Sequence, residues 1–170
     1  FSRGEQALHP LRTAGDCFND LCEPILYTDL QRMLDDDYPD GRRYYWKSLF
    51  LPVLSDQCID IIVAAGKSRP SPLSSIDVWM LGGAVSHVSP ESTAFAQRDE
   101  PWLIGIEANW EGADADERNI DWVRSTFGKL LPYSSGRAYV NFGGSWEEKA
   151  QTRAQAYGTN LARLDAIRSR

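Results

Sequence analysis

Cysteine, histidine and long apolar runs are scarce in this sequence, and each shortage excludes a class of protein. Three cysteines, Cys17, Cys22 and Cys58, are too few for the disulfide framework of a small secreted domain. Their spacing, and the wide separation of the two histidines, His9 and His87, match no common zinc pattern. We therefore expect no metal site, free and mostly buried thiols, and a reducing compartment, with the cytoplasm favoured.

Positive charge is also scarce. Eighteen Lys and Arg against 24 Asp and Glu give a net charge of −6, which argues against nucleic acid as a partner. No apolar run approaches the roughly 18 residues of a membrane-spanning helix, and the Phe-Ser-Arg-Gly-Glu start is not a signal peptide. Because residue 1 is Phe and the only methionines are Met33 and Met80, we expect an internal piece of a longer protein.

Turn-forming residues suggest three regions along the chain. Pro10, Gly15 and Pro24 interrupt any regular period, so residues 1–27 are expected to be an irregular lead-in or linker. A folded domain is expected over residues 28–145, followed by C-terminal helices over 146–170, with Trp146 helical and a break at Gly158. Residues 35–37 are all aspartate, but the EF-hand spacing is absent, which favours a solvated turn over a calcium site.

Hydrophobic periodicity predicts an α+β fold for the domain. Strands are expected over residues 42–49, 75–81, 102–110 and 138–142, and helices over 55–65 and from 114 or 116 to 131. The order β-α-β-β-α-β is the ferredoxin-like split βαβ arrangement, an antiparallel sheet of at least four strands with helices on one face. Residues 83–100 lack a clear period and predict a long functional loop.

Alternation along each strand assigns side chains to the two faces of the sheet. In the first strand, Tyr44 and Trp46 are expected to face the helices, and Tyr45 and Lys47 to face away. The complete outward set is Lys47, Asp77, Trp79, Glu107, Asn109, Tyr139 and Asn141. Such a face is solvated, stacks in a homodimer or binds a substrate, and the pattern alone leaves these alternatives open.

Several segments resemble one protein family, in the same order along nearly the whole chain. They are PDGRRYYWKSLF (39–50), PSPLSSIDVWMLGGAVSHV (70–88), STAFAQRD (92–99), AYVNF (138–142) and AYGTNLARLDAIRSR (156–170). Together these segments resemble the berberine bridge enzyme-like FAD-linked oxidases. The pairing of Tyr-Val-Asn-Phe with a later Ala-Tyr-Gly-x-Asn-x-x-Arg-Leu is the most specific part of the match.

The resemblance implies a fragment of an FAD-dependent oxidoreductase. In that family an N-terminal domain binds FAD, and a second domain covers the flavin with the open face of its sheet. This chain looks like the second, substrate-binding portion. Its implied partners are its own FAD domain and a small-molecule substrate, while FAD itself would be held mainly outside the fragment, which alone should be inactive. The family chemistry passes a hydride from a substrate C–H to the flavin, while a base takes a proton.

The resemblance also assigns residues. Tyr139 and Asn141 match a Tyr-x-Asn motif that lies beside the flavin and substrate in the family. Several relatives have a tyrosine base where this chain has Phe142, so Glu107 is the first candidate for the base and Tyr139 the second. Lys47, Asp77, Trp79, Asn109 and Phe142 are expected to face substrate or flavin.

Three further positions match the family outside the sheet. Arg98, in the Thr-x-Phe-x-x-Arg pattern that begins at Thr93, is expected to hold the long loop. Tyr157 and Asn160 are expected to dock the C-terminal helices on the FAD domain.

The alternative prediction is a protein of a different class, a stand-alone ferredoxin-like binding module that dimerises through its open sheet face and has no flavin.

Overall fold

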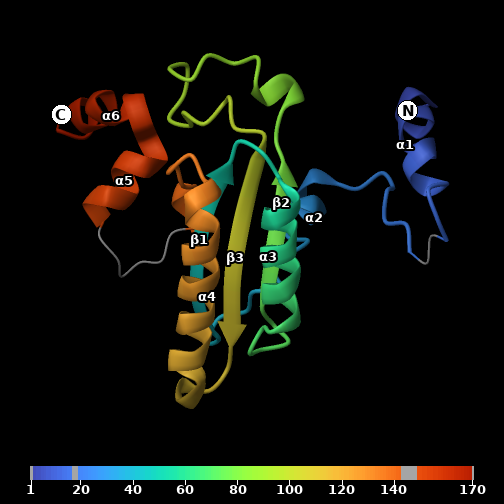
Figure 1. Ribbon diagram of the computed structural model, residues 1–170. Helices are drawn as coiled ribbons and strands as arrows, with labels where there is room; N and C mark the ends of the chain where they lie inside the picture. Colours follow the sequence, from blue (N-terminus) through green and yellow to red (C-terminus); the bar gives the residue numbers. More distant parts are fainter. Residues whose placement is uncertain (1, 17–18, 143–148, 170) are drawn as a thin grey trace. The chain divides into compact units, whose positions relative to one another are not determined.

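The computed structural model describes residues 2–16, 19–142 and 149–169, and Figure 1 shows its helices and strands. The chain divides into two compact units, Phe1–Asp40 and Gly41–Arg170. Cys17, Trp146 and the boundary predicted after residue 145 lie outside the described residues.

The first unit contains two helices, α1 (Ser2–Arg12) and α2 (Tyr27–Leu30). The expectation of an irregular segment over residues 1–27 is wrong for α1, which continues through Pro10. A proline removes one backbone N–H and crowds the preceding turn. Because α1 ends at Arg12, two residues after Pro10, the proline lies in the last turn of the helix.

The second unit contains a three-stranded antiparallel sheet, which agrees with the predicted α+β class. Its strands are β1 (Arg43–Leu51), β2 (Ser75–Met80) and β3 (Trp102–Trp110), in the order β1-β3-β2. The longer helices are α3 (Asp56–Lys67), α4 (Asp116–Leu130), α5 (Lys149–Tyr157) and α6 (Leu161–Arg168). Short 3₁₀ turns occupy Gly83–Val85, Ala113–Ala115, Leu131–Tyr133, Val140–Phe142 and Gly158–Asn160.

Helices α3 and α4 cover one face of this sheet (Figure 1). The buried side chains between them form a single cluster of Tyr45, Leu49, Leu51, Cys58, Ile104, Ile106, Ala108, Trp110, Ala115, Trp122, Val123 and Leu130. Ser55 caps α3 by accepting a hydrogen bond from the Cys58 backbone N–H at 3.4 Å. The Trp122 indole joins the two helices by donating to the Ala65 carbonyl at 3.0 Å.

Asp116, the first residue of α4, connects that helix to the sheet. Its carboxylate accepts hydrogen bonds from the Arg43 guanidinium and from the Trp110 indole. These contacts, the Arg43 bond first, lower the pKa of Asp116 below its ordinary value, because they favour the ionised form. A carboxylate in the first turn is also favoured by the helix dipole.

Strand register identifies the sheet face away from the helices, because residues opposite each other in a ladder share a face. Gly105 lies opposite Ser48 on one side and Asp77 on the other. The full set, which we call the open face, is Tyr44, Trp46, Ser48, Phe50, Ser75, Asp77, Trp79, Leu103, Gly105, Glu107 and Asn109.

The predicted faces of β1 are wrong. Tyr45 is buried beneath α4, where its hydroxyl accepts from Arg124 at 3.3 Å, and the Lys47 ammonium lies 4.8 Å from the Phe127 ring centroid of α4. Tyr44 and Trp46 lie on the open face instead. Because β1 is at the edge of the sheet, long amphipathic side chains can bury their stems and still carry their polar ends outward.

The prediction of at least four strands is also wrong, because the described residues form three, and the split βαβ arrangement is not confirmed. The chain after α4 begins to pair with β1, since the Ser135 N–H donates to the Phe50 carbonyl and the Phe50 N–H to the Arg137 carbonyl. At the next position the Ser48 side chain intervenes. Its hydroxyl accepts from the Tyr139 N–H at 2.9 Å and donates to the Tyr139 carbonyl at 3.2 Å.

Ser48 therefore draws the chain off the edge of β1 and onto the open face. A 3₁₀ turn over Val140–Phe142 follows, and it carries the Phe142 ring across Gly105. A Cβ atom at position 105 would lie 3.5 Å from that ring and 3.3 Å from Glu107 Oε1. The space above Gly105 is thus filled by these two side chains, and a larger residue would have to displace them.

Among the described residues, no helix has both the length and the apolar content needed to cross a bilayer.

We predict that Gly105→Val destabilises the protein by about 1–3 kcal/mol, the usual result of overfilling a packed site. The added side chain displaces Phe142 and the Glu107 carboxylate. Urea unfolding followed by tryptophan fluorescence measures the loss. Gly128→Ala, in α4, is the matched control, because nothing lies within 4 Å of its added Cβ and alanine favours a helix. An unchanged unfolding midpoint for Gly105→Val contradicts the prediction.

Candidate functional site

One end of the open face carries a hollow of about 740 Å³, a volume typical of small-molecule sites. Its lining comes from β2, from the loop that follows β2, from β3, from the segment with the 3₁₀ turn Val140–Phe142, and from α5. The lining residues are Trp79, Leu81, Val85, Ala94, Phe95, Gln97, Arg98, Leu103, Tyr139, Val140, Asn141, Phe142 and Ala156.

The long loop after β2 forms one wall of the hollow. Its two ends are joined, because the Leu81 N–H donates to the Pro101 carbonyl at 2.8 Å. Gly82 and Gly83 begin the loop with φ values of 146° and 55°, which residues with a side chain rarely adopt.

Aromatic rings connect this loop to the sheet. Phe95 meets Tyr139, Tyr139 meets Phe142 and Phe142 meets Trp46, with centroid distances of 6.2, 5.2 and 6.1 Å and nearly perpendicular planes. Edge-to-face pairs of this kind are favourable beyond their buried area. The series fixes the orientation of the Tyr139 and Phe142 rings within the hollow.

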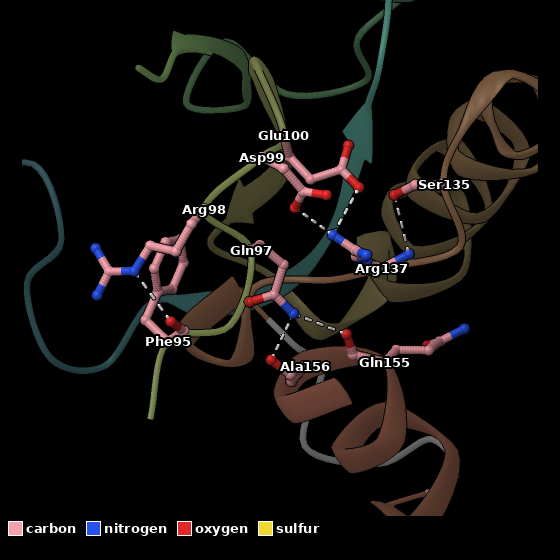
Figure 2. A network of polar contacts seen from close by, with 9 residues as sticks. All are labelled: Phe95, Gln97, Arg98, Asp99, Glu100, Ser135, Arg137, Gln155 and Ala156. Carbon is pink, nitrogen blue, oxygen red and sulfur yellow. Dashed lines mark hydrogen bonds and ion pairs between the residues drawn. The ribbon is translucent and has the colours of Figure 1, made fainter. Parts of the chain in front are cut away.

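A buried amide joins the loop to α5, as Figure 2 shows. Gln97 is only 2% exposed, and its Nε2 donates to the carbonyls of Gln155 at 3.0 Å and Ala156 at 2.6 Å. The Gln155 carbonyl also accepts from the Ala138 N–H at 3.4 Å. Three of the segments that surround the hollow therefore meet at one carbonyl oxygen.

Arg137 holds the end of the same loop. Its guanidinium lies 2.6 Å from Asp99 and 3.2 Å from the buried Glu100 (Figure 2). The hydrogen bond from Arg137 lowers the pKa of Asp99 below its ordinary value of 3.8, because it stabilises the carboxylate.

Asn160 and Tyr157 were both expected to dock on another domain. The Asn160 amide donates to the carbonyls of Pro90 and Thr93 at 2.7 and 3.0 Å, so it holds the chain's own loop, and its docking role stays a prediction. Tyr157 is half-buried at the end of α5, and its docking role stays a prediction.

The structure gathers only some of the predicted site residues in the hollow. Trp79, Tyr139, Asn141 and Phe142 line it. The Asn141 Nδ2 donates to the Tyr139 hydroxyl oxygen at 3.0 Å, so the Tyr139 O–H remains able to donate to a ligand.

The other predicted residues do not line the hollow. Glu107 is on the open face but only 2% exposed, with its Oε1 close to Gly105. Asn109 is buried, where its amide accepts from the Trp46 indole at 2.7 Å and donates to the Leu73 carbonyl at 3.0 Å. Asp77 lies opposite Gly105. Lys47 faces α4, so its predicted orientation toward substrate or flavin is wrong.

One residue of the hollow carried little signal in the sequence, and a second was recognised only for its contacts within the loop. Arg98 was expected to hold the loop, and it does so, with Nε donating to the Phe95 carbonyl and Nη2 to the Thr93 hydroxyl. Arg98 also lines the hollow. The sequence could not predict this position, because it depends on how the loop folds. Gln97 gave no sign of its buried contacts, because its acceptors are main-chain carbonyls 58 and 59 residues further along the chain. The described residues include no group of three or more His, Cys, Asp and Glu side chains that could hold a metal ion.

Comparisons with known proteins agree with the resemblance seen in the motifs. The chain is 32% identical over 115 residues to an FAD-linked oxidoreductase of Dictyostelium discoideum, a match covering 66% of the chain and 25% of that protein. It is 26% identical over 112 residues to the hexose oxidase of Chondrus crispus, covering 61% of the chain and 20% of that protein. No protein-family model matches the chain.

Solved structures share the fold. Berberine bridge enzyme-like protein 28 of Arabidopsis thaliana gives a TM-score of 0.68 at 21% identity, over 76% of this chain and 31% of that one. A xylooligosaccharide oxidase of Myceliophthora thermophila, solved with xylobiose, gives 0.73 at 18% identity, over 99% of this chain and 40% of that one.

The chain therefore resembles the berberine bridge enzyme-like FAD-linked oxidases in sequence and in fold, as its motifs predicted. It spans about a quarter of the length of the curated relatives that it matches.

We predict that Gln97→Leu loosens α5 from the loop and destabilises this contact by about 1–3 kcal/mol, because two main-chain carbonyls lose a buried donor. Amide hydrogen exchange should accelerate in residues 153–157 and leave β3 unchanged. Gln155→Ala is the matched control, since Gln155 acts through its main-chain carbonyl, which alanine retains. Equal exchange in Gln97→Leu and in the control contradicts the role given to this amide.

We predict an acid-dependent contribution from the Asp99–Arg137 pair. The pKa of Asp99 is lowered in the folded protein, so its stabilisation is complete above the ordinary value and is lost as the pH falls through the folded pKa. Asp99→Asn should lower the free energy of unfolding at pH 6 by less than about 1 kcal/mol, as for other exposed pairs. The difference in the free energy of unfolding between this variant and the unmodified protein should disappear as the pH drops below 3.8.

Urea midpoints between neutral and acidic pH measure this difference. Asp121→Asn, which removes an exposed carboxylate of α4, controls for the change in net charge. If the loss of unfolding free energy in Asp99→Asn stays constant with pH, the prediction is wrong.

Proposed function

We propose that this chain is the substrate-binding portion of an FAD-dependent oxidoreductase, and that the hollow on its open face receives the substrate beside the flavin. The observation that carries the proposal is the grouping of a phenol, an amide and several aromatic rings in one hollow, on the sheet face away from α3 and α4. Its similarity to a quarter of an FAD-linked oxidoreductase supports the same reading.

The residues of the hollow fit a planar heteroaromatic ring or a substrate next to one. Trp79, Phe95 and Phe142 offer aromatic surface, and Tyr139 and Asn141 offer hydrogen bonds. FAD, when bound, supplies the acceptor for a hydride from the substrate. The chain's own contribution is to orient the substrate, exclude water with its apolar lining, and accept a proton.

Two side chains are candidates for the proton acceptor. A general base must come within hydrogen-bond reach of the proton that it removes. Tyr139 lines the hollow, and in the base role its oxygen acts as a phenolate that accepts a hydrogen bond from the Asn141 amide. Glu107 is only 2% exposed and does not line the hollow. The geometry therefore favours Tyr139, which reverses the order that the motifs suggested.

We predict that Tyr139→Phe in the full-length protein lowers the rate of flavin reduction by substrate at least ~100-fold, the usual size of a general-base contribution. Glu107→Gln should lower it less than ~10-fold, since its carboxylate is outside the hollow. Stopped-flow absorbance of the flavin measures both rates. Tyr133→Phe is the matched control, because this tyrosine lies outside the hollow.

The same preparation tests the function itself. Absorption spectra before and after denaturation should show bound flavin in the full-length protein. A protein without flavin that forms dimers through the open face supports the stand-alone binding module instead. A larger loss in Glu107→Gln than in Tyr139→Phe transfers the role of base to Glu107.

A further inference from the structure

Arg98 gives the hollow a positive charge. Among the described residues that line it, Arg98 is the single charged side chain, and the others are apolar, aromatic or neutral polar groups. The whole chain carries a net charge of −6, whereas the charge at the hollow is positive. Arg98 is half-buried, and an anionic ligand beside a guanidinium gains charge-assisted hydrogen bonds, which are stronger than those between neutral groups.

Two carboxylates follow Arg98 in the sequence, but both are directed elsewhere. Asp99 and Glu100 meet the guanidinium of Arg137. Figure 2 shows the Arg98 side chain on the other side of this loop, beside Phe95. The chain thus uses a second arginine to pair with the acids nearest to Arg98.

The contacts of Arg98 itself are neutral. Its Nε donates to the Phe95 carbonyl at 3.2 Å, its Nη2 donates to the Thr93 hydroxyl at 2.7 Å, and its guanidinium lies 4.9 Å from the Phe95 ring centroid. These contacts fix the plane of the guanidinium without cancelling its charge. A guanidinium has five N–H donors, so it keeps donors for a ligand.

We propose that Arg98 binds the carboxylate of a largely apolar ligand in the hollow. This inference rests on the proposed function and adds the class of substrate: an aromatic or aliphatic molecule with one acid group. A fixed guanidinium matches a carboxylate with two parallel hydrogen bonds. The aromatic lining receives the rest of the ligand, and Tyr139 and Asn141 lie on the same hollow.

A phosphate group shares this anionic chemistry but fits the hollow less well. Phosphate sites commonly use several backbone N–H groups or a helix N-terminus together with basic side chains. The described lining offers one cation and a mainly apolar surface. We therefore assign the anion to a carboxylate on an apolar body.

The test compares two probes of the same shape, 2-naphthoate and its neutral analogue 2-naphthamide, by isothermal titration calorimetry with the full-length protein. The acid should bind about 10- to 100-fold more tightly than the amide, as expected for a charge-assisted pair. Arg98→Gln should abolish this preference. Arg98→Lys should retain part of it, because lysine keeps the charge and loses the paired geometry.

Arg163→Gln is the matched control. Arg163 contacts the same loop through the Glu91 carbonyl at 3.2 Å but is not part of the hollow's lining, so the preference for the acid should remain. Equal binding of the two probes to the unmodified protein overturns the inference, as does a preference that survives in Arg98→Gln. Tighter, Arg98-dependent binding of pyrophosphate overturns the assignment to a carboxylate. In each of these cases a bound flavin leaves the proposed function standing.

Discussion

The hydroxyl of Ser48 decides where the chain runs after α4. An ordinary fourth strand would continue to pair with the main chain of β1, and the first two hydrogen bonds of that pairing are present at Phe50. The Ser48 hydroxyl then forms hydrogen bonds with both the main-chain N–H and the main-chain carbonyl of Tyr139. Because Ser48 points to the open face, the chain follows it there and forms a wall over the sheet.

Gly105 leaves room for the aromatic side chain that this turn places over the sheet. The Phe142 ring occupies the space above it, beside the Glu107 carboxylate. Phe142 then positions Tyr139, and Tyr139 meets Phe95 of the opposite loop. The Ser48 hydroxyl at the edge of the sheet and Gly105 in its central strand together determine the position of Tyr139, whose phenol the proposed chemistry uses.

Elements governed by local pattern could be predicted from the sequence. Strand β3 was predicted over its observed residues, because its apolar side chains alternate cleanly, and the helix expected over residues 55–65 is α3. The faces of β1 could not be predicted, since aromatic side chains occupy both of them. The end of pairing at Tyr139 depends on Ser48, 91 residues away, and no local pattern carries that information.

The candidate site divides in the same way. The motifs and strand parity brought attention to Trp79, Tyr139 and Asn141, which do line the hollow. The positions of Gln97 and Arg98 depend on which partner each side chain finds after the loop folds. Gln97 finds two carbonyls of α5, and Arg137 takes the acids next to Arg98.

The junction at the Gln155 carbonyl holds the walls of the hollow together through contacts that the core beneath α3 and α4 does not share. The loop, the 3₁₀ turn and α5 are bound to one another largely through main-chain acceptors and one buried amide. The sheet is bound to α3 and α4 through a different set of apolar side chains. Substitutions in the two sets should act additively on stability. Evolution can therefore reshape the walls for new ligands while the folded sheet remains intact.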